Sequence, residues 1–295
     1  MNLRQLDTFK AVAETGSIRA AARLLCLTQP AVTHTVRELE QSVGALLLRR
    51  SVKGVELTDL GTALLKRAHL VLNEVRRTQE EIIQLRDGLG GSLCIAFSSI
   101  AAMRVLTPAL KAFRAMRPQV ALELHEVTLP AVQDQWQNGK YDFAVLSELD
   151  EHAEDSFERS VLFSTPLVVA ARARHPQVKA TSILELRNAF WLVPGYGQKV
   201  LNQIFGVKNM APPDDVVFCQ SSSFALDIMR QSDAVGIFSS LMFQDPFMSR
   251  GLVALDLVDK LPKARVSIVV RNGASLTPAG NVFIQCLKNA VPKLD

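Results

Sequence analysis

Residues 16–61 read GSIRAAARLLCLTQPAVTHTVRELEQSVGALLLRRSVKGVELTDLG, and this stretch decides the fold. Ser17 and Thr28 each stand directly before a run of apolar residues at helical spacing, and their hydroxyls can cap a helix N-terminus. Pro30 fits the first turn of the second run, where its missing N–H is not needed. The pattern predicts two helices, each beginning one residue after its cap and joined by a three-residue corner. A helix pair of this kind is typical of a helix-turn-helix.

The second predicted helix has one apolar face. Its residues at helical spacing, expected to be buried, are Ala31, Val32, Val36, Leu39 and Val43. The other side is left to Gln29, Thr33, His34 and Arg37, which are the candidates for contact with the bases of DNA.

A basic hairpin is predicted directly after the helix pair. Arg49, Arg50 and Lys53 cluster around a Lys53-Gly54 turn, which is flanked by short apolar runs. Such a wing can reach phosphates or a minor groove, so Arg50 and Lys53 join the DNA-binding candidates. A solvated basic loop is the alternative. The first 58 residues hold eight cations and five anions, so their net charge of +3 is most of the chain's +4. An excess this small predicts weak, salt-sensitive binding by one copy and therefore a dimer.

A long helix is predicted from Leu60 to Asp87. Its apolar residues recur at spacings of three and four, as in a coiled-coil seam, and three glycines follow at 88, 90 and 91. We favour a coiled coil between two protomers. The alternative is an amphipathic helix lying on its own domain.

The rest of the chain alternates short apolar runs with helical patterns, which predicts an α/β fold with a mostly parallel sheet. The predicted strands are Leu93–Phe97, Val120–His125, Phe143–Leu146, Leu167–Ala171, Phe190–Val193, Val216–Cys219, Val235–Phe238 and Val266–Val270. The predicted helices include Leu106–Met116, Ala131–Trp136 and Phe224–Arg230.

Along its whole length the sequence resembles the LysR-type transcriptional regulators. The resemblance is most specific in the A-A-x-x-L core of the first helix, T-Q-P-A-V-T at residues 28–33, R-E-L-E at 37–40 and L-T-x-x-G at 57–61. It implies a winged helix-turn-helix domain (residues 1–58), a linker helix for dimerisation (59–90) and an effector-binding domain (91–295). The last would have two periplasmic-binding-protein-like α/β lobes, lobe I from 92–163 and 267–292 and lobe II from 164–266. The resemblance also implies that Gln29, Pro30, Thr33 and His34 face the DNA, and it adds Thr28 and Pro30 to the DNA-binding candidates. The sequence departs from the family at Leu48, Lys53 and His34, where an aromatic, an arginine and a longer cation are usual.

The resemblance also implies a ligand between the lobes and a tetramer built from two dimers, with RNA polymerase as a further candidate partner. Ligands of open α/β sheets lie beyond the carboxyl ends of strands. Hydroxyls and helix N-termini there predict a small organic anion, an aromatic carboxylate or sulfonate. The candidate residues are Ser98, Ser99, Thr128, Ser147, Tyr196, Ser222 and Ser223. Ordinary helix capping is the alternative for the serines and the threonine, and surface packing for Tyr196.

The sequence does not predict an enzyme. His125 and His175 have no Ser-His-Asp or Cys-His arrangement beside them, and the four cysteines show no metal spacing, so we expect neither a cofactor nor a metal. Without a signal-peptide-like or membrane-spanning apolar run, we expect the protein in the cytoplasm. The prediction is a sequence-specific DNA-binding regulator switched by a small anion. The alternative is a cytoplasmic small-molecule binding protein of the solute-binding type.

Overall fold

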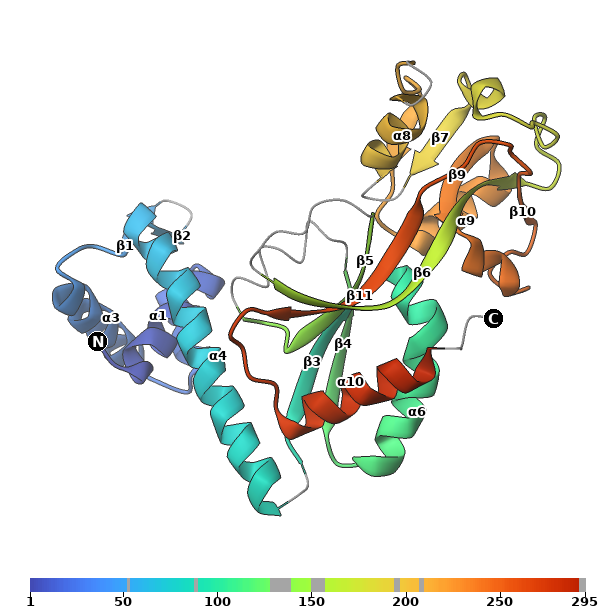
Figure 1. The fold of residues 1–295 in the computed structure, drawn as a ribbon. Coiled ribbons are helices and arrows are strands. Elements are labelled where there is room, and N and C mark those ends of the chain that lie inside the picture. The colour runs from blue at the N-terminus through green and yellow to red at the C-terminus, as the bar shows by residue number, and fades with distance from the viewer. Residues whose placement is uncertain are drawn as a thin grey trace. The chain divides into compact units, whose positions relative to one another are not determined.

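The structure, a computed structural model, describes residues 1–51, 54–87, 90–127, 139–149, 157–193, 197–206 and 210–291. The chain divides into two compact units, the first built on Met1–Gly88 and the second on the chain from Leu89 to Asp295 (Figure 1). Of the helices within the described ranges, none is long and apolar enough to cross a membrane.

The first unit begins with a three-helix cluster. Its elements are α1 (Leu3–Thr15), α2 (Ile18–Leu24), α3 (Gln29–Val43), β1 (Leu48–Ser51), β2 (Gly54–Leu57) and α4 (Asp59–Asp87). Both predicted helix starts are confirmed: the Ser17 hydroxyl accepts from Ala20 N at 3.3 Å and the Thr28 hydroxyl from Ala31 N at 3.4 Å. The corner between α2 and α3 turns at Cys26, whose φ of 53° is left-handed.

The predicted apolar face of α3 packs into the core of the first unit. Val32 and Val36 pack with residues of α1 and α2, and Leu39 packs with Phe9 and Leu47. Burial of Val43 was a wrong prediction, because its side chain is 43% exposed. Val43 lies in the last turn of α3, one turn beyond Leu39, the last α3 residue in the core.

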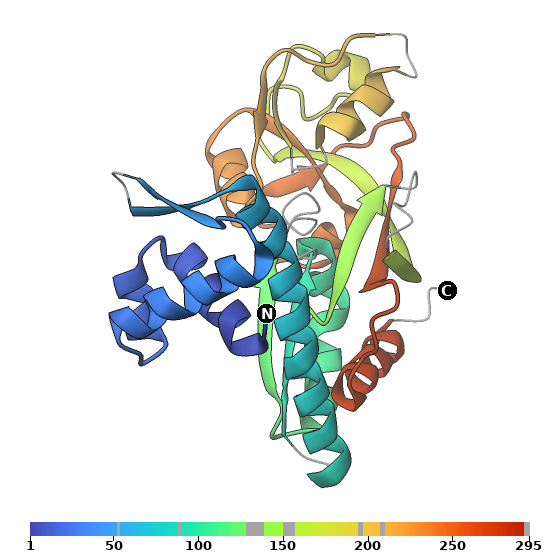
Figure 2. The same cartoon turned by 90° about the vertical axis from the view of Figure 1, so that its left-hand side faces the viewer.

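The wing is an antiparallel hairpin in which Leu48 pairs with Leu57 and Ser51 with Gly54. Figure 2 shows it extending from the helix cluster. Two contacts fix its base: Glu40 Oε1 of α3 accepts from Leu47 N at 2.9 Å and from Leu48 N at 3.1 Å. The predicted turn at Lys53 lies outside the described residues.

The predicted long helix is confirmed as α4, with 29 residues. Its first turns pack on its own unit: Leu64 contacts the Phe9 cluster and Ala68 is only 1% exposed. Further along, Ile82 and Leu85 are exposed. At Leu64 and Ala68 the predicted seam therefore follows the alternative interpretation, a helix packed on its own domain, whereas Ile82 and Leu85 present apolar side chains to solvent.

The second unit is built on one sheet, in the order β4-β3-β5-β11-β6-β9-β7-β8, with β10 paired to β6. The strands are β3 (Ser92–Phe97), β4 (Ala121–Glu126), β5 (Phe143–Leu149), β6 (Phe157–Arg172), β7 (Phe190–Val193), β8 (Val216–Phe218), β9 (Ala234–Ser239), β10 (Leu252–Ala254) and β11 (Lys263–Arg271).

Strands β6 and β11 pass between two lobes of the second unit (Figure 1). Pairing is parallel among β4, β3 and β5 and among β8, β7 and β9, but antiparallel wherever β6, β10 or β11 takes part. The prediction of a mostly parallel sheet was therefore wrong at its centre, because the strands that connect the lobes run against their neighbours.

Helices cover the faces of both lobes. They are α5 (Ser99–Ala101), the π-helix η1 (Ala102–Leu106), α6 (Thr107–Met116), the 3₁₀ helices η2 (Ile183–Leu186) and η3 (Ser240–Gln244), α8 (Gly197–Gly206), α9 (Ser222–Gln231) and α10 (Pro278–Ala290). The helix predicted from Leu106 is preceded by helical turns from Ser99 onward. The helix predicted at Ala131–Trp136 lies outside the described residues.

Aromatic side chains fill the two lobe cores. In lobe I, Phe283 of α10 lies 4.9 Å from Phe113 of α6 and 6.0 Å from Phe143 of β5, measured between ring centroids. In lobe II, Trp191 meets Phe205 edge-on at 6.1 Å and donates its indole N–H to Leu186 O at 2.9 Å. These contacts hold each sheet half against its helices and leave the strand ends to face the cleft between the lobes.

Candidate functional site

The surface of α3 carries most of the residues predicted to contact DNA. Gln29, Pro30, His34 and Arg37 are exposed, whereas Thr33 is half-buried and donates its hydroxyl to Gln29 O at 2.9 Å. His34 Nδ1 lies 3.6 Å from Glu38 Oε1. Exposed amide and guanidinium groups on a helix whose other face is buried can reach base edges in a major groove.

The wing adds cations close to this helix in the chain. Arg49 is exposed and its Nε lies 3.3 Å from Glu56 Oε2 on the paired strand. Arg50 belongs to β1, but its side chain, like all of Lys53, lies outside what the structure describes.

The L-T-x-x-G motif ties the wing to α4. Thr58 N donates to Leu47 O at 3.0 Å, and the Thr58 hydroxyl accepts from Gly61 N at 2.9 Å. A Cβ on Gly61 would lie 2.0 Å from Leu47 O, which is far inside contact distance. The glycine is therefore required by the close approach of the strand, and the motif fixes the angle between hairpin and helix.

A second candidate site is a cleft of about 620 Å³ between the two lobes. Its lining is mostly apolar and comes from β3, α5, η1 and β4 of lobe I and from α9 and the chain after η3 in lobe II. The lining residues are Phe97, Ser99, Ala102, Met103, Leu106, Leu124, His125, Glu126, Ser222, Ser223, Leu226, Arg230, Phe247 and Met248. This volume and lining suit a small organic ligand.

Polar contacts cross the cleft. Ser222 donates its hydroxyl to Ser99 Oγ at 2.9 Å, and Ser99 in turn donates to Glu126 Oε1 at 2.5 Å. Elsewhere between the lobes, Arg104 donates to Gln244 Oε1 at 2.9 Å. The guanidinium of Arg230 donates to Met248 O and Arg250 O, both at 3.0 Å, which holds a positive charge in the cleft wall. The cleft thus offers hydroxyls, one carboxylate and one fixed cation.

Three of the seven predicted effector residues, Ser99, Ser222 and Ser223, line this cleft. Ser98 and Ser147 are absent from the lining, and the hydroxyl oxygen of each is buried without a hydrogen-bond partner among the residues that the structure describes. Thr128 and Tyr196 lie outside the described residues.

Sequence reasoning missed the charged members of the lining. Glu126 stands one residue beyond a predicted strand, and this position at a strand end was the available signal for it. For Arg230 the signal was its place at the end of a predicted helix that faces the cleft.

Taken together, a winged helix-turn-helix and a two-lobed domain with a ligand-sized cleft define a ligand-responsive DNA-binding regulator. The family profile for the LysR substrate binding domain matches residues 86–292, and that for the bacterial regulatory helix-turn-helix protein of the lysR family matches residues 3–68. The chain belongs to the LysR family of transcriptional regulators. It is therefore a regulator and not an enzyme.

Named relatives agree with this assignment. The regulator TdcA of Escherichia coli is 24% identical over 97% of this chain and 92% of its own length. AlsR of Bacillus subtilis is 29% identical over 79% of this chain and 74% of its own. The full-length LysR regulator CbnR has the same fold, with a TM-score of 0.72 and 21% identity over 99% of both chains.

Proposed function

We propose that this regulator reads DNA through the exposed face of α3 and the wing. The observation that carries the proposal is the division of α3 into a buried side, at Val32, Val36 and Leu39, and an exposed side that holds Gln29 and Arg37. A glutamine can make two hydrogen bonds to an adenine, whereas wing cations reach phosphates common to all sequences. CbnR has been solved in complex with its target DNA, and that structure has a TM-score of 0.70 with this chain and is 22% identical to it over 98% of this chain and 100% of its own length.

The experiment is a binding titration by fluorescence anisotropy with promoter DNA and with unrelated DNA at two salt concentrations. Gln29→Ala should relax the preference for one sequence, with a loss of about 1–3 kcal/mol confined to the specific site. Lys53→Ala should weaken binding to both DNAs alike and lower the salt slope by about one. Unchanged discrimination in Gln29→Ala would refute the assignment of α3 as the reading helix.

Two copies of the chain are needed to hold DNA in this way, because the excess positive charge of one winged helix is small. The exposed side chains of Ile82 and Leu85 on α4 support pairing of protomers through this helix, and a pair of dimers would form the tetramer. Ile82→Glu should lower the mass measured by light scattering, whereas the exposed polar Gln79→Glu is the matched control. An unchanged mass in Ile82→Glu would place the contact elsewhere.

The effector we propose is a small organic anion with an aromatic body. Helices α5 and α9 begin at Ser99 and Ser222, whose hydroxyls lie within hydrogen-bond distance of each other across the cleft. The N-terminus of a helix favours negative charge. Arg230 adds a fixed cation, and Phe97, Leu226 and Phe247 supply apolar surface. The Glu126 carboxylate repels the acid group of a ligand that has no other polar group. A ligand with a hydroxyl beside its acid group therefore fits the lining better.

Calorimetry with benzoate, salicylate and benzenesulfonate tests this choice, with benzylamine and glucose as a cation and a sugar. Salicylate should bind more tightly than benzoate because its hydroxyl can donate to Glu126. Ser222→Ala should weaken binding by about 10- to 100-fold, through loss of a hydrogen bond to a charged group. Ser232→Ala, at the other end of α9, should not. Heat from benzylamine or glucose alone would refute the anion. A ligand switches the protein only if it binds its two quaternary states with different affinity.

A further inference from the structure

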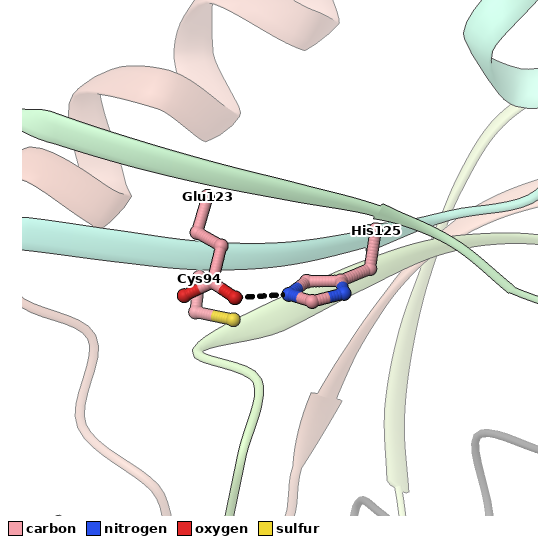
Figure 3. A group of neighbouring side chains, drawn as sticks. All are labelled: Cys94, Glu123 and His125. Carbon is pink, nitrogen blue, oxygen red and sulfur yellow. Dashed lines mark hydrogen bonds and ion pairs between the residues drawn. The ribbon is translucent and has the colours of Figure 1, made fainter.

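Three side chains with metal-binding chemistry meet on one face of the lobe I sheet. Cys94 of β3 is the register partner of Glu123 on β4, and His125 lies two residues further along β4, on the same face as Glu123. Figure 3 shows the Cys94 thiol next to the Glu123 carboxylate, with the His125 imidazole facing them and bonded to that carboxylate. The opposite face of β3 carries Leu93 and Ile95 into the core. These three polar groups are therefore not part of the packing between the sheet and its helices.

The spacing of the three groups suits one ion. A sulfur, a nitrogen and a carboxylate oxygen lie within 4.8 Å of one another, in the only group of three or more such donors among the described residues. His125 Nε2 lies 2.6 Å from Glu123 Oε1. Two ligands of a tetrahedral zinc ion stand about 3.3 Å apart, from bond lengths of about 2.0 Å, so a small side-chain rotation opens room for the ion.

The surroundings hold the thiol in place and leave a route to it. Cys94 is 8% exposed, and its backbone N–H donates to Asp142 Oδ2 at 2.8 Å. β4 is the edge strand of the sheet, and the Glu123 side chain is 66% exposed. The buried thiol therefore lies beside a carboxylate that is open to solvent at the sheet edge.

We propose that Cys94, Glu123 and His125 bind a zinc ion. Thiolate, imidazole and carboxylate are the three ligand types that zinc takes in proteins, and three protein ligands leave a fourth position for water. On binding, the Cys94 thiol loses its proton to solvent and its sulfur bonds to the ion, so zinc affinity should rise with pH.

The test uses the untagged full-length chain with zinc or cobalt salts. Competition with a chromophoric chelator measures zinc affinity, and cobalt loading should give a thiolate-to-metal charge-transfer band together with tetrahedral d–d bands. Cys94→Ser should remove that band and lower zinc affinity by more than about 100-fold, since losing even an outer partner of a metal ligand costs 10- to 100-fold. Cys219→Ser, which removes another partly buried thiol, is the matched control.

Glu123→Gln guards against misfolding of Cys94→Ser, because position 123 is exposed and the amide keeps the shape of the side chain. It should fold as the unmodified chain does, by circular dichroism, and lose zinc affinity by at least tenfold. Zinc bound no more tightly by the unmodified chain than by Glu123→Gln would overturn the proposal. So would a cobalt band that persists in Cys94→Ser or is lost in Cys219→Ser.

Discussion

The close approach of Leu47 to Gly61 allows a sharp test of how the wing is held. In Gly61→Ala the new Cβ would lie 2.0 Å from Leu47 O and 3.1 Å from Leu57 Cδ2. The first of these atoms is backbone, so the strand and α4 must separate. Overpacking costs about 1–3 kcal/mol, and weakening the bond from Thr58 N to Leu47 O adds about 1 kcal/mol. We expect a loss of about 2–4 kcal/mol in the stability of the first unit.

The assay must see the first unit directly. The first 90 residues contain no Trp or Tyr, so intrinsic fluorescence of those rings does not report it. Hydrogen exchange followed by mass spectrometry does, on peptides that cover α3. A loss of about 2–4 kcal/mol in stability corresponds to amide hydrogen exchange about 30- to 700-fold faster. Gly44→Ala is the control, because open space surrounds Gly44 and only its φ of 74° opposes a side chain, at about 1–2 kcal/mol. Exchange in Gly61→Ala no faster than in the control would refute the reasoning.

Three further predictions concern single side chains. Glu40→Ala removes the acceptor for Leu47 N and Leu48 N and should lower stability of the first unit by about 1–3 kcal/mol, with weaker binding to all DNA, as hydrogen exchange and anisotropy would measure. Burial lowers the pKa of His69 below 6.5, and the opposing effect of the Glu14 carboxylate is smaller. The folded chain therefore favours the neutral imidazole, and its stability should fall as pH drops below 6.5. His69→Gln should flatten this pH dependence of stability, as measured by hydrogen exchange. Hydrogen bonds from the backbone of Thr181 and Ser182 lower the pKa of Glu185 below 4.5, so its stabilisation is present above pH 4.5 and is lost as pH falls through the folded-state pKa; Glu185→Gln and the unmodified chain should differ in Trp fluorescence melts at neutral pH and converge in acid.

Local chemistry was enough to predict the elements of the first unit. Ser17, Thr28 and Pro30 determine where α2 and α3 begin through interactions within four residues, and such interactions can be recognised in a sequence. The same holds for the heptad spacing of α4. Val43 shows the limit, since helical spacing gives its face but not whether any neighbour extends far enough to cover it.

Long-range pairing could not be predicted in the same way. The first ten residues of β6, from Phe157, alternate in burial and lack the continuous apolar run that marked Leu167–Ala171. Their place is set by β11, about a hundred residues later in the sequence. The antiparallel centre of the sheet follows from that partnership, and no local pattern in either strand carries it.

The residues of the candidate sites also differ in whether local sequence or long-range pairing places them. Ser99 and Ser222 were predicted because each stands between a strand and a helix, and this topology brings strand ends to one cleft. Glu126 and His125 belong to the lining only because β4 lies beside β3 in parallel register. That register also brings Cys94 against Glu123, across 29 residues of sequence with no metal-binding spacing.

His125 connects the effector cleft with the proposed zinc site of lobe I. It lines the cleft proposed for the effector and supplies the imidazole of the proposed zinc site. A zinc ion would hold the ring in one orientation and add positive charge beside the cleft, which should favour an anionic ligand. Linkage then requires the converse, so that the anion tightens zinc binding by the same factor. Measuring salicylate affinity with and without zinc, in the unmodified chain and in Glu123→Gln, separates this coupling from a direct effect of zinc on the ligand, because only the unmodified chain should respond.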